Sequence, residues 1–142
     1  MQNNELKAGT KADKRTAAES CTSASLVQNG MLPAVLHLTL TKKWFDMIKS
    51  GEKKEEYRQD KMYWKDRFVK KGYWHSQTCK DFDIVRFKNG YAKGAPKMDV
   101  ECKGIRLADL CDVNPKWFGS FQDYEGCRIF IISLGRVLSV TE

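Results

Sequence analysis

Apolar positions follow a strand pattern and then a helix pattern from residue 35 onward. Residues 35–40, VLHLTL, alternate so that three leucines share one face, which is typical of a half-buried strand. Thr41 suits the N-cap of a following helix, whose apolar face consists of Trp44, Phe45 and Ile48. Gly51 suits the end of this helix, because glycine adopts the left-handed conformation at little cost.

The rest of the chain contains more strand patterns than helix patterns. Further strands are expected in four segments, which are residues 53–58, 83–88, 98–107 and 128–134, with residues 136–140 extending the last. Gly104 is expected to interrupt the third of them. A second helix is expected over residues 61–70, with Trp64 and Phe68 paired at i, i+4. Because these elements do not alternate as β-α-β units, we predict an α+β fold, a small mixed or antiparallel barrel of five or six strands with two flanking helices.

The chain changes character near residue 31. Residues 1–31 are rich in Ala, Ser, Thr, Lys and Asn and contain no aromatic residue. Such a segment cannot bury enough apolar surface to offset the entropy of ordering it. We therefore expect a disordered tail over residues 1–31 and one domain over residues 32–142, and Met31 is an alternative start site.

Positive charge is concentrated in one part of the sequence. The chain has 25 Lys or Arg against 18 Asp or Glu, and its pI is about 9.2. Residues 42–71 hold eleven of the basic and six of the acidic residues, and therefore most of the surplus. Clustered cations create a directed field, so this window favours an anionic partner.

Several other classes of site are not indicated. Five cysteines occur without a C-x-x-C pair, and only two histidines are present, so neither a zinc site nor a disulfide framework is expected. No P-loop or dinucleotide-binding glycine pattern occurs, and we expect no cofactor. No apolar run is long enough to span a bilayer, and the N-terminus lacks the hydrophobic segment of a signal peptide. A monomeric cytoplasmic protein with reduced thiols is the expectation.

The candidate chemistry lies in a motif that follows the first helix. Gly51, Lys53, Glu56 and Arg58 form the pattern G-x-K-x-x-E-x-R, after a strand and a helix at the corresponding distance. Over roughly residues 34–138 this arrangement resembles the ASCH domain, a member of the PUA-like superfamily. The resemblance implies a PUA-like barrel with a cleft, lined by the motif, that binds RNA or a nucleotide-like ligand. Some relatives are hydrolases that remove the acetyl group from acetylated cytidine.

Each motif residue has a role and a plainer alternative. Lys53 offers a cation for phosphate or, if desolvated, a reactive amine; the alternative is a solvated surface lysine. Glu56 and Arg58 share a strand face, so Glu56 can orient Arg58 toward a phosphate or a base; the alternative is a structural ion pair. Tyr57 points the other way and is interpreted as core. For Lys53 and for the pair Glu56 and Arg58, the sequence alone leaves both the functional role and the plainer alternative open.

Aromatic residues provide a second candidate for RNA binding. Tyr73 and Trp74 lie among lysines in an expected loop and are candidates for stacking on bases. Trp64 fits core packing better, because Phe68 follows it at helical spacing.

A hydrolase is the alternative function. In the acetylcytidine-hydrolysing relatives, the motif lysine acts with a threonine three residues later and with a glutamate from a later strand. Lys53 matches the lysine and Glu101 is the candidate acid, but position 56 is Glu, so that hydroxyl is missing. A ribonuclease that uses Lys53 and Glu56 as acid and base is also open, as is an inactive interaction module.

Overall fold

The computed structural model describes residues 31–73, 75–117 and 128–142. The chain divides into two compact units, residues 1–33 and 34–142. The tail expected over residues 1–31 lies, apart from Met31, outside the described residues. The second unit contains the elements that the sequence predicts.

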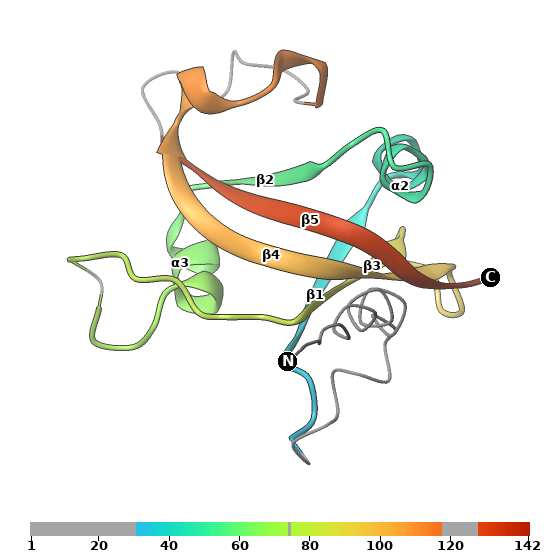
Figure 1. Cartoon of the computed structure of the whole chain (residues 1–142), viewed down its shortest axis with the longest axis horizontal. Helices are drawn as coiled ribbons and strands as arrows, with labels where there is room; N and C mark the ends of the chain where they lie inside the picture. The colour runs from blue at the N-terminus through green and yellow to red at the C-terminus, as the bar shows by residue number, and fades with distance from the viewer. Residues whose placement is uncertain (1–30, 74, 118–127) are drawn as a thin grey trace, which may run out of the picture. The chain divides into compact units, whose positions relative to one another are not determined.

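Five strands and two α-helices are present in the described part of the second unit (Figure 1). In chain order they are β1 (Val35–Leu40), α2 (Lys42–Lys49), β2 (Glu55–Gln59), α3 (Met62–Phe68), β3 (Ile84–Asn89), β4 (Lys97–Asp109) and β5 (Arg128–Thr141). Two short 3₁₀ turns, η3 (Leu110–Asp112) and η4 (Pro115–Trp117), follow β4. The predicted strands and helices are therefore confirmed, except that Lys53 and Lys54 precede β2 and do not belong to it.

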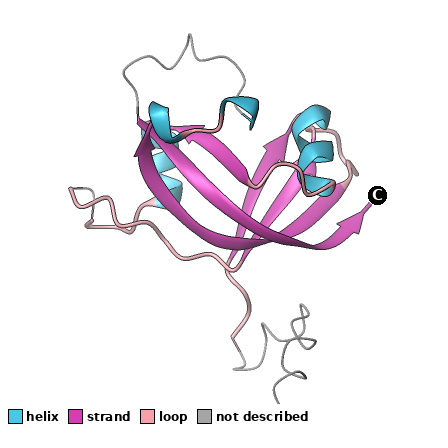
Figure 2. Ribbon diagram, turned by 45° about the horizontal axis from the view of Figure 1, so that its top comes forward, coloured by secondary structure: helices cyan, strands magenta, loops and turns pink. Residues whose placement is uncertain are grey.

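The strands form one mixed sheet in the order β1-β3-β4-β5-β2. Only β1 and β3 are parallel among the described pairs, and the other neighbours are antiparallel. The sheet curls into a half-barrel, which confirms the predicted α+β, barrel-like fold (Figures 1 and 2). Its two edge strands, β1 and β2, border an opening, with α2 at one end and α3 at the other.

The curl is associated with irregular pairing in β4. The register between β4 and β5 shifts at three points between Asp99 and Gly104. Bulges of this kind bend a strand and increase its twist. Gly104 has φ 131°, which L side chains rarely adopt. The predicted interruption at Gly104 is therefore a local irregularity of the pairing, and the strand itself continues through this residue.

The concave side of the half-barrel holds the main hydrophobic core. Both helices and four of the strands contribute side chains, among them Leu38, Phe45, Phe68, Phe87 and Phe130. A smaller cluster on the other side of β5 contains Tyr57, Ala108, Val113, Ile129 and Ile131. The interpretation of Tyr57 as a core residue is confirmed. The strand β5 thus contributes to both clusters from its two faces, whereas β2 contributes Tyr57 to the smaller one.

A tight turn after α2 positions the motif. Gly51 has φ 82° and donates its N–H to the Ile48 carbonyl, and the Lys53 N–H bonds to the Met47 carbonyl at 3.0 Å. The chain therefore folds back along the end of the helix, as expected for a glycine after a C-cap. At the other end, Thr41 precedes the helix in an extended conformation, but its side chain makes no capping hydrogen bond.

Replacing Gly51 by Ala should lower the free energy of unfolding by about 1–2 kcal/mol, because an L side chain is strained at this positive φ. The added Cβ would lie 3.6 Å from the Lys54 ammonium, an ordinary contact, so the cost comes from the backbone. Urea denaturation measures the loss, and Gly51→Asn should lose less because Asn tolerates this conformation. Equal losses in both variants would contradict this explanation.

Candidate functional site

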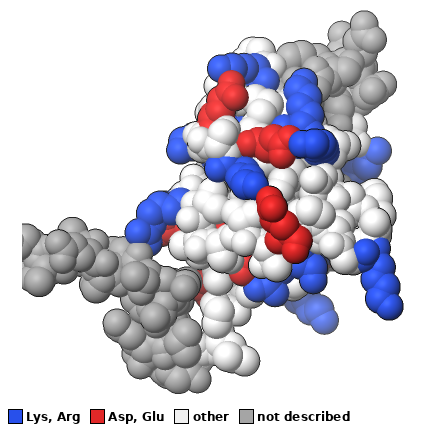
Figure 3. All heavy atoms as spheres, turned by 90° about the vertical axis from the view of Figure 1, so that its right-hand side faces the viewer, with Lys and Arg blue, Asp and Glu red and all other residues white. Residues whose placement is uncertain are grey.

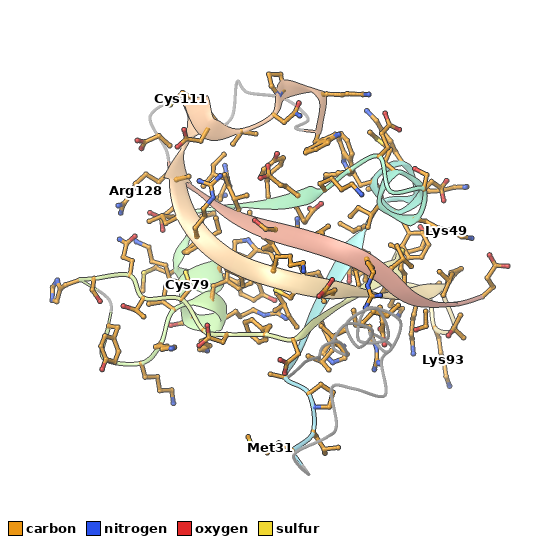
Figure 4. The ribbon with its side chains drawn as sticks, viewed as in Figure 1. Met31, Lys49, Cys79, Lys93, Cys111 and Arg128 are labelled. Atoms are coloured by element: carbon orange, nitrogen blue, oxygen red, sulfur yellow. The ribbon has the colours of Figure 1, made fainter. Side chains whose placement is uncertain are left out.

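A cavity of about 650 Å³ lies at the opening between β1 and β2. Its walls come from β1, β2, both α-helices and two later loops, and they consist of His37, Leu38, Thr39, Leu40, Thr41, Trp44, Lys53, Glu56, Tyr57, Arg58, Tyr63, Trp64, Arg67, Tyr91 and Trp117. Side chains project between the curled sheet and the helices in this region (Figure 4). All three charged residues of the motif are therefore in one cavity.

Lys53 is buried in the floor of this cavity, with 3 % of its surface exposed. Its ammonium lies 2.6 Å from a Glu56 carboxylate oxygen and 4.3 Å from the centre of the Trp44 ring. The aromatic face and the carboxylate stabilise the ammonium where water cannot. The alternative of a solvated surface lysine is therefore excluded.

Glu56 holds a second cation as well. Its other carboxylate oxygen accepts a hydrogen bond from Arg58, and only 4 % of Glu56 is exposed. Glu56 and Arg58 lie opposite Ile132 and Phe130 on β5, which are core residues, so the predicted shared face is correct. One buried carboxylate thus bridges Lys53 and Arg58.

Arg58 also links the two edges of the sheet. Its guanidinium donates to the Tyr57 carbonyl at 2.7 Å on β2 and to the Thr39 carbonyl at 3.2 Å on β1. From α3, Arg67 donates to the His37 carbonyl of β1 at 2.6 Å. Two arginines therefore satisfy backbone carbonyls on the edge of β1, where no strand of the described residues pairs with it.

Aromatic rings flank these arginines. The Arg58 and Arg67 guanidinium carbons lie 5.1 and 5.4 Å from the centre of the Trp64 ring. Arg67 also donates to the Tyr63 hydroxyl at 3.0 Å. Trp64 stacks on Phe68 with ring centres 5.3 Å apart, so the predicted core pairing is correct, but the same ring also forms part of the cavity wall.

Burial changes the protonation behaviour of two groups. It lowers the pKa of the Lys53 amine below its ordinary value of 10.5, and the nearby Arg58 and Lys43 act in the same direction, whereas Glu56 opposes them. Burial and a hydrogen bond to Glu55 raise the pKa of the Tyr57 hydroxyl above its ordinary value of 10.0. Lys53 is thus the cavity cation whose charge is easiest to remove.

The described residues of the cavity wall carry more positive than negative charge. Among them Glu56 is the only carboxylate, whereas three are cations, namely Lys53, Arg58 and Arg67. Arg67 has no carboxylate partner within the described ranges. An anion or an electron-rich ring edge is therefore the favoured occupant.

Trp117 adds a further hydrogen-bond donor to the cavity wall. Its indole nitrogen is buried and has no hydrogen-bond partner in the described part of the chain. A buried donor without an acceptor is costly, and a bound ligand with an acceptor at this point would remove the cost.

Two other candidates from the sequence are not brought to this cavity, and a third cannot be placed. Tyr73 is exposed and is not part of its wall. Glu101 lies on β4, where it pairs with Lys103 and accepts from the Arg136 N–H, and it is not part of the wall either. Trp74 lies outside the described residues.

The sequence does not identify several residues of the cavity wall. Trp44 and Trp64 occupy apolar helix positions, and helical spacing alone cannot separate a core residue from a cavity wall. The one available signal for Arg67 is its place in the basic window, three residues after Trp64 and therefore on the same helix face.

Comparisons with known protein families, with curated proteins and with solved structures give no match to this chain. Among the described residues, no three His, Cys, Asp or Glu side chains are grouped closely enough to hold a metal ion. No helix in the same residues is long and apolar enough to cross a membrane.

The buried Lys53 should make stability depend on pH. Its folded-state pKa is lowered, so the unfolded chain binds more protons between that pKa and 10.5, and stability rises with pH over this window. Lys53→Met removes the titrating group but leaves Glu56 paired with Arg58. In urea denaturation from pH 7 to above 10, the unfolding free energy of wild type minus Lys53→Met should increase, by up to about 1.4 kcal/mol per pH unit. Parallel curves for the two proteins would contradict a lowered pKa.

Proposed function

We propose that the cavity between β1 and β2 binds a nucleotide-like ligand, either as a free nucleotide or as one unit of single-stranded RNA. The observation that carries this proposal is the combination, in one cavity, of two arginines, a buried Lys-Glu pair and several aromatic rings. We also propose that the chain is an ASCH-type, PUA-like domain. The strand-helix-motif order of residues 35–58 and the curled mixed sheet support this assignment.

Size and composition of the cavity support a nucleoside unit. Ligand cavities in proteins usually enclose about 300–1,000 Å³, and 650 Å³ falls within this range. Aromatic walls and guanidinium planes bind unstacked bases by stacking, and the cations bind phosphate. A base pair within a duplex cannot enter such a cavity, so single strands and free nucleotides are the expected ligands.

The Glu56 carboxylate also determines how Arg58 is oriented in the cavity. It fixes Arg58 in one orientation, since the guanidinium is held by Glu56 and by the Tyr57 and Thr39 carbonyls. A positioned guanidinium loses less entropy on binding than a mobile one. Arg58 is therefore the residue that contributes most to binding in this proposal.

Arg58→Ala should weaken nucleotide or RNA binding by about 10- to 100-fold, as expected for loss of a charge-assisted hydrogen bond. Binding of labelled single- and double-stranded RNA of 12 nucleotides is measured by fluorescence anisotropy. Binding of nucleoside monophosphates is measured by calorimetry, and both are measured at two salt concentrations. Wild type should prefer the single strand, and binding to RNA should fall with salt.

Arg106→Ala is the matched control, because Arg106 is exposed on β4 and lies outside the cavity wall. It should bind as wild type does, and circular dichroism checks that both variants fold. Absence of wild-type binding to any of these ligands at low salt, or equal losses in both variants, would reject the proposed function.

We propose a nucleoside amidohydrolase as the second candidate, on the observation that the Lys53 amine is buried with a lowered pKa. A neutral amine can take a proton from a water molecule that attacks the acetyl carbonyl of an acetylated cytidine, with acetate and cytidine as products. Glu56 lies within hydrogen-bond distance and can share that proton. The cavity wall holds no second carboxylate in the described residues, which makes this candidate weaker than binding alone.

If this second candidate is correct, wild type releases acetate from acetylated cytidine. The rate should rise as the pH passes through the lowered pKa of Lys53, because the neutral amine is the active form. Lys53→Met should abolish turnover while the protein stays folded. Chromatography of the nucleoside products measures turnover, and gel analysis of an incubated RNA strand checks the ribonuclease alternative. Turnover that survives Lys53→Met would exclude Lys53 as the base.

A further inference from the structure

A second cavity of about 330 Å³ adjoins the first. The two share part of β1 and one residue of α3, which are His37, Leu38, Thr39 and Arg67. The remaining residues of the second cavity are all basic, namely Arg86, Lys88 and Lys97. They lie on β3, which pairs with β1, and on β4, which pairs with β3.

Lys88 and Lys97 form an unfavourable pair in the sheet. They lie directly opposite each other on β3 and β4, and Thr39 of β1 lies opposite Lys88. Like charges at directly opposed positions destabilise a sheet. Neither lysine has a carboxylate partner in the described residues, although Lys88 donates to the Tyr91 carbonyl at 3.4 Å. A bound anion would remove this repulsion.

Among the described residues, a neighbouring cation on β3 has a carboxylate partner, unlike Lys88 and Lys97. One row away, Arg86 makes a two-point ion pair with Asp99, at 2.6 and 2.7 Å. Figure 3 shows acidic and basic side chains interspersed on the side of the domain that carries α2, the end of β5 and the loop between β3 and β4. The uncompensated pair Lys88 and Lys97 lines the second cavity, and Lys88 lies opposite Thr39, which lines both cavities.

Residues of both cavities are in contact through β1 and Tyr91. Thr39 contributes to both walls, and its carbonyl accepts from Arg58 of the first cavity. Tyr91 belongs to the wall of the first cavity, and its carbonyl accepts from Lys88 of the second. A ligand that fills the first cavity therefore lies next to the cations of the second.

We propose that the second cavity binds a phosphate group of the same ligand whose nucleoside unit occupies the first cavity. This inference rests on the proposed function and extends it, because it makes a phosphate-bearing ligand, and not a bare nucleoside, the preferred partner. The phosphate belongs either to the next phosphodiester of a single strand or to the polyphosphate of a free nucleotide. Arg67, which contributes to both walls, contacts the ligand between its two parts.

The test compares wild type, Lys88→Gln/Lys97→Gln and the control Lys103→Gln/Arg106→Gln, which removes the same charge from exposed positions of β4. The ligands are the four nucleosides, their mono- and triphosphates, and a single-stranded RNA of 12 nucleotides. Lys88→Gln/Lys97→Gln should bind nucleosides as wild type does and lose about tenfold or more on phosphate-bearing ligands. Loss on the triphosphate alone identifies a free nucleotide, and loss on the RNA identifies a strand.

For RNA, the salt dependence provides an independent readout. Each phosphate neutralised on a single strand contributes about 0.7 to the slope of log K against log salt, so loss of two contacts should reduce the slope by about 1.4. Without ligand, Lys88→Gln/Lys97→Gln should be at least as stable to urea as wild type, since the repulsion is gone. If the two lysines had a purely structural role, the variant that binds more weakly would also be less stable to urea.

Unchanged binding of every phosphate-bearing ligand by Lys88→Gln/Lys97→Gln, or an equal loss in the control, would overturn the inference while leaving the first cavity intact. Failure of the proposed function has a different signature, because wild type would then bind no nucleoside or nucleotide at all. RNA binding that depends on Lys88 and Lys97 in that situation would show a phosphate site at the second cavity alone.

Discussion

The buried carboxylate of Glu56 is the interaction on which the rest of the site depends. It accepts hydrogen bonds from Lys53 and Arg58, so one negative charge holds two cations at the opening of the half-barrel. Replacing a buried ion pair by apolar residues is often neutral or stabilising, whereas removing one partner is strongly destabilising. A buried ion cluster is therefore weak evidence for stability, and its presence in the cavity is consistent with the proposed ligand binding.

The open side of the sheet is the second constraint. β1 and β2 are edges, and the carbonyls of His37 and Thr39 accept hydrogen bonds from the side chains of Arg67 and Arg58. Because arginine side chains are long, they can bond to the edge carbonyls while β1 and β2 stay apart. The barrel therefore stays open and a cavity remains. The same guanidinium groups that complete the backbone hydrogen bonding thus supply the positive charge on which the proposed ligand binding depends.

Local sequence patterns were sufficient for the elements and for part of the site. Alternation in residues 35–40 places the leucines of β1 in the core, and the two-residue spacing of Glu56 and Arg58 puts them on one face of β2. The left-handed conformation of Gly51 follows from its position after a helix. These features depend on backbone geometry over a few residues, which the sequence encodes directly.

Long-range pairing decided which of these faces meet. The curl of β4 and β5 brings α2 and α3 to opposite ends of one cavity. Trp44 and Trp64 therefore contribute to its walls as well as to the core. Glu101 of β4 lies outside the cavity wall. Burial of Lys53 depends on the same closure and could not be inferred from its polar surroundings in the chain. The sequence by itself thus determined the elements and the motif. Only the tertiary structure determined the cavity, because strand order and curvature depend on contacts between residues far apart in the chain.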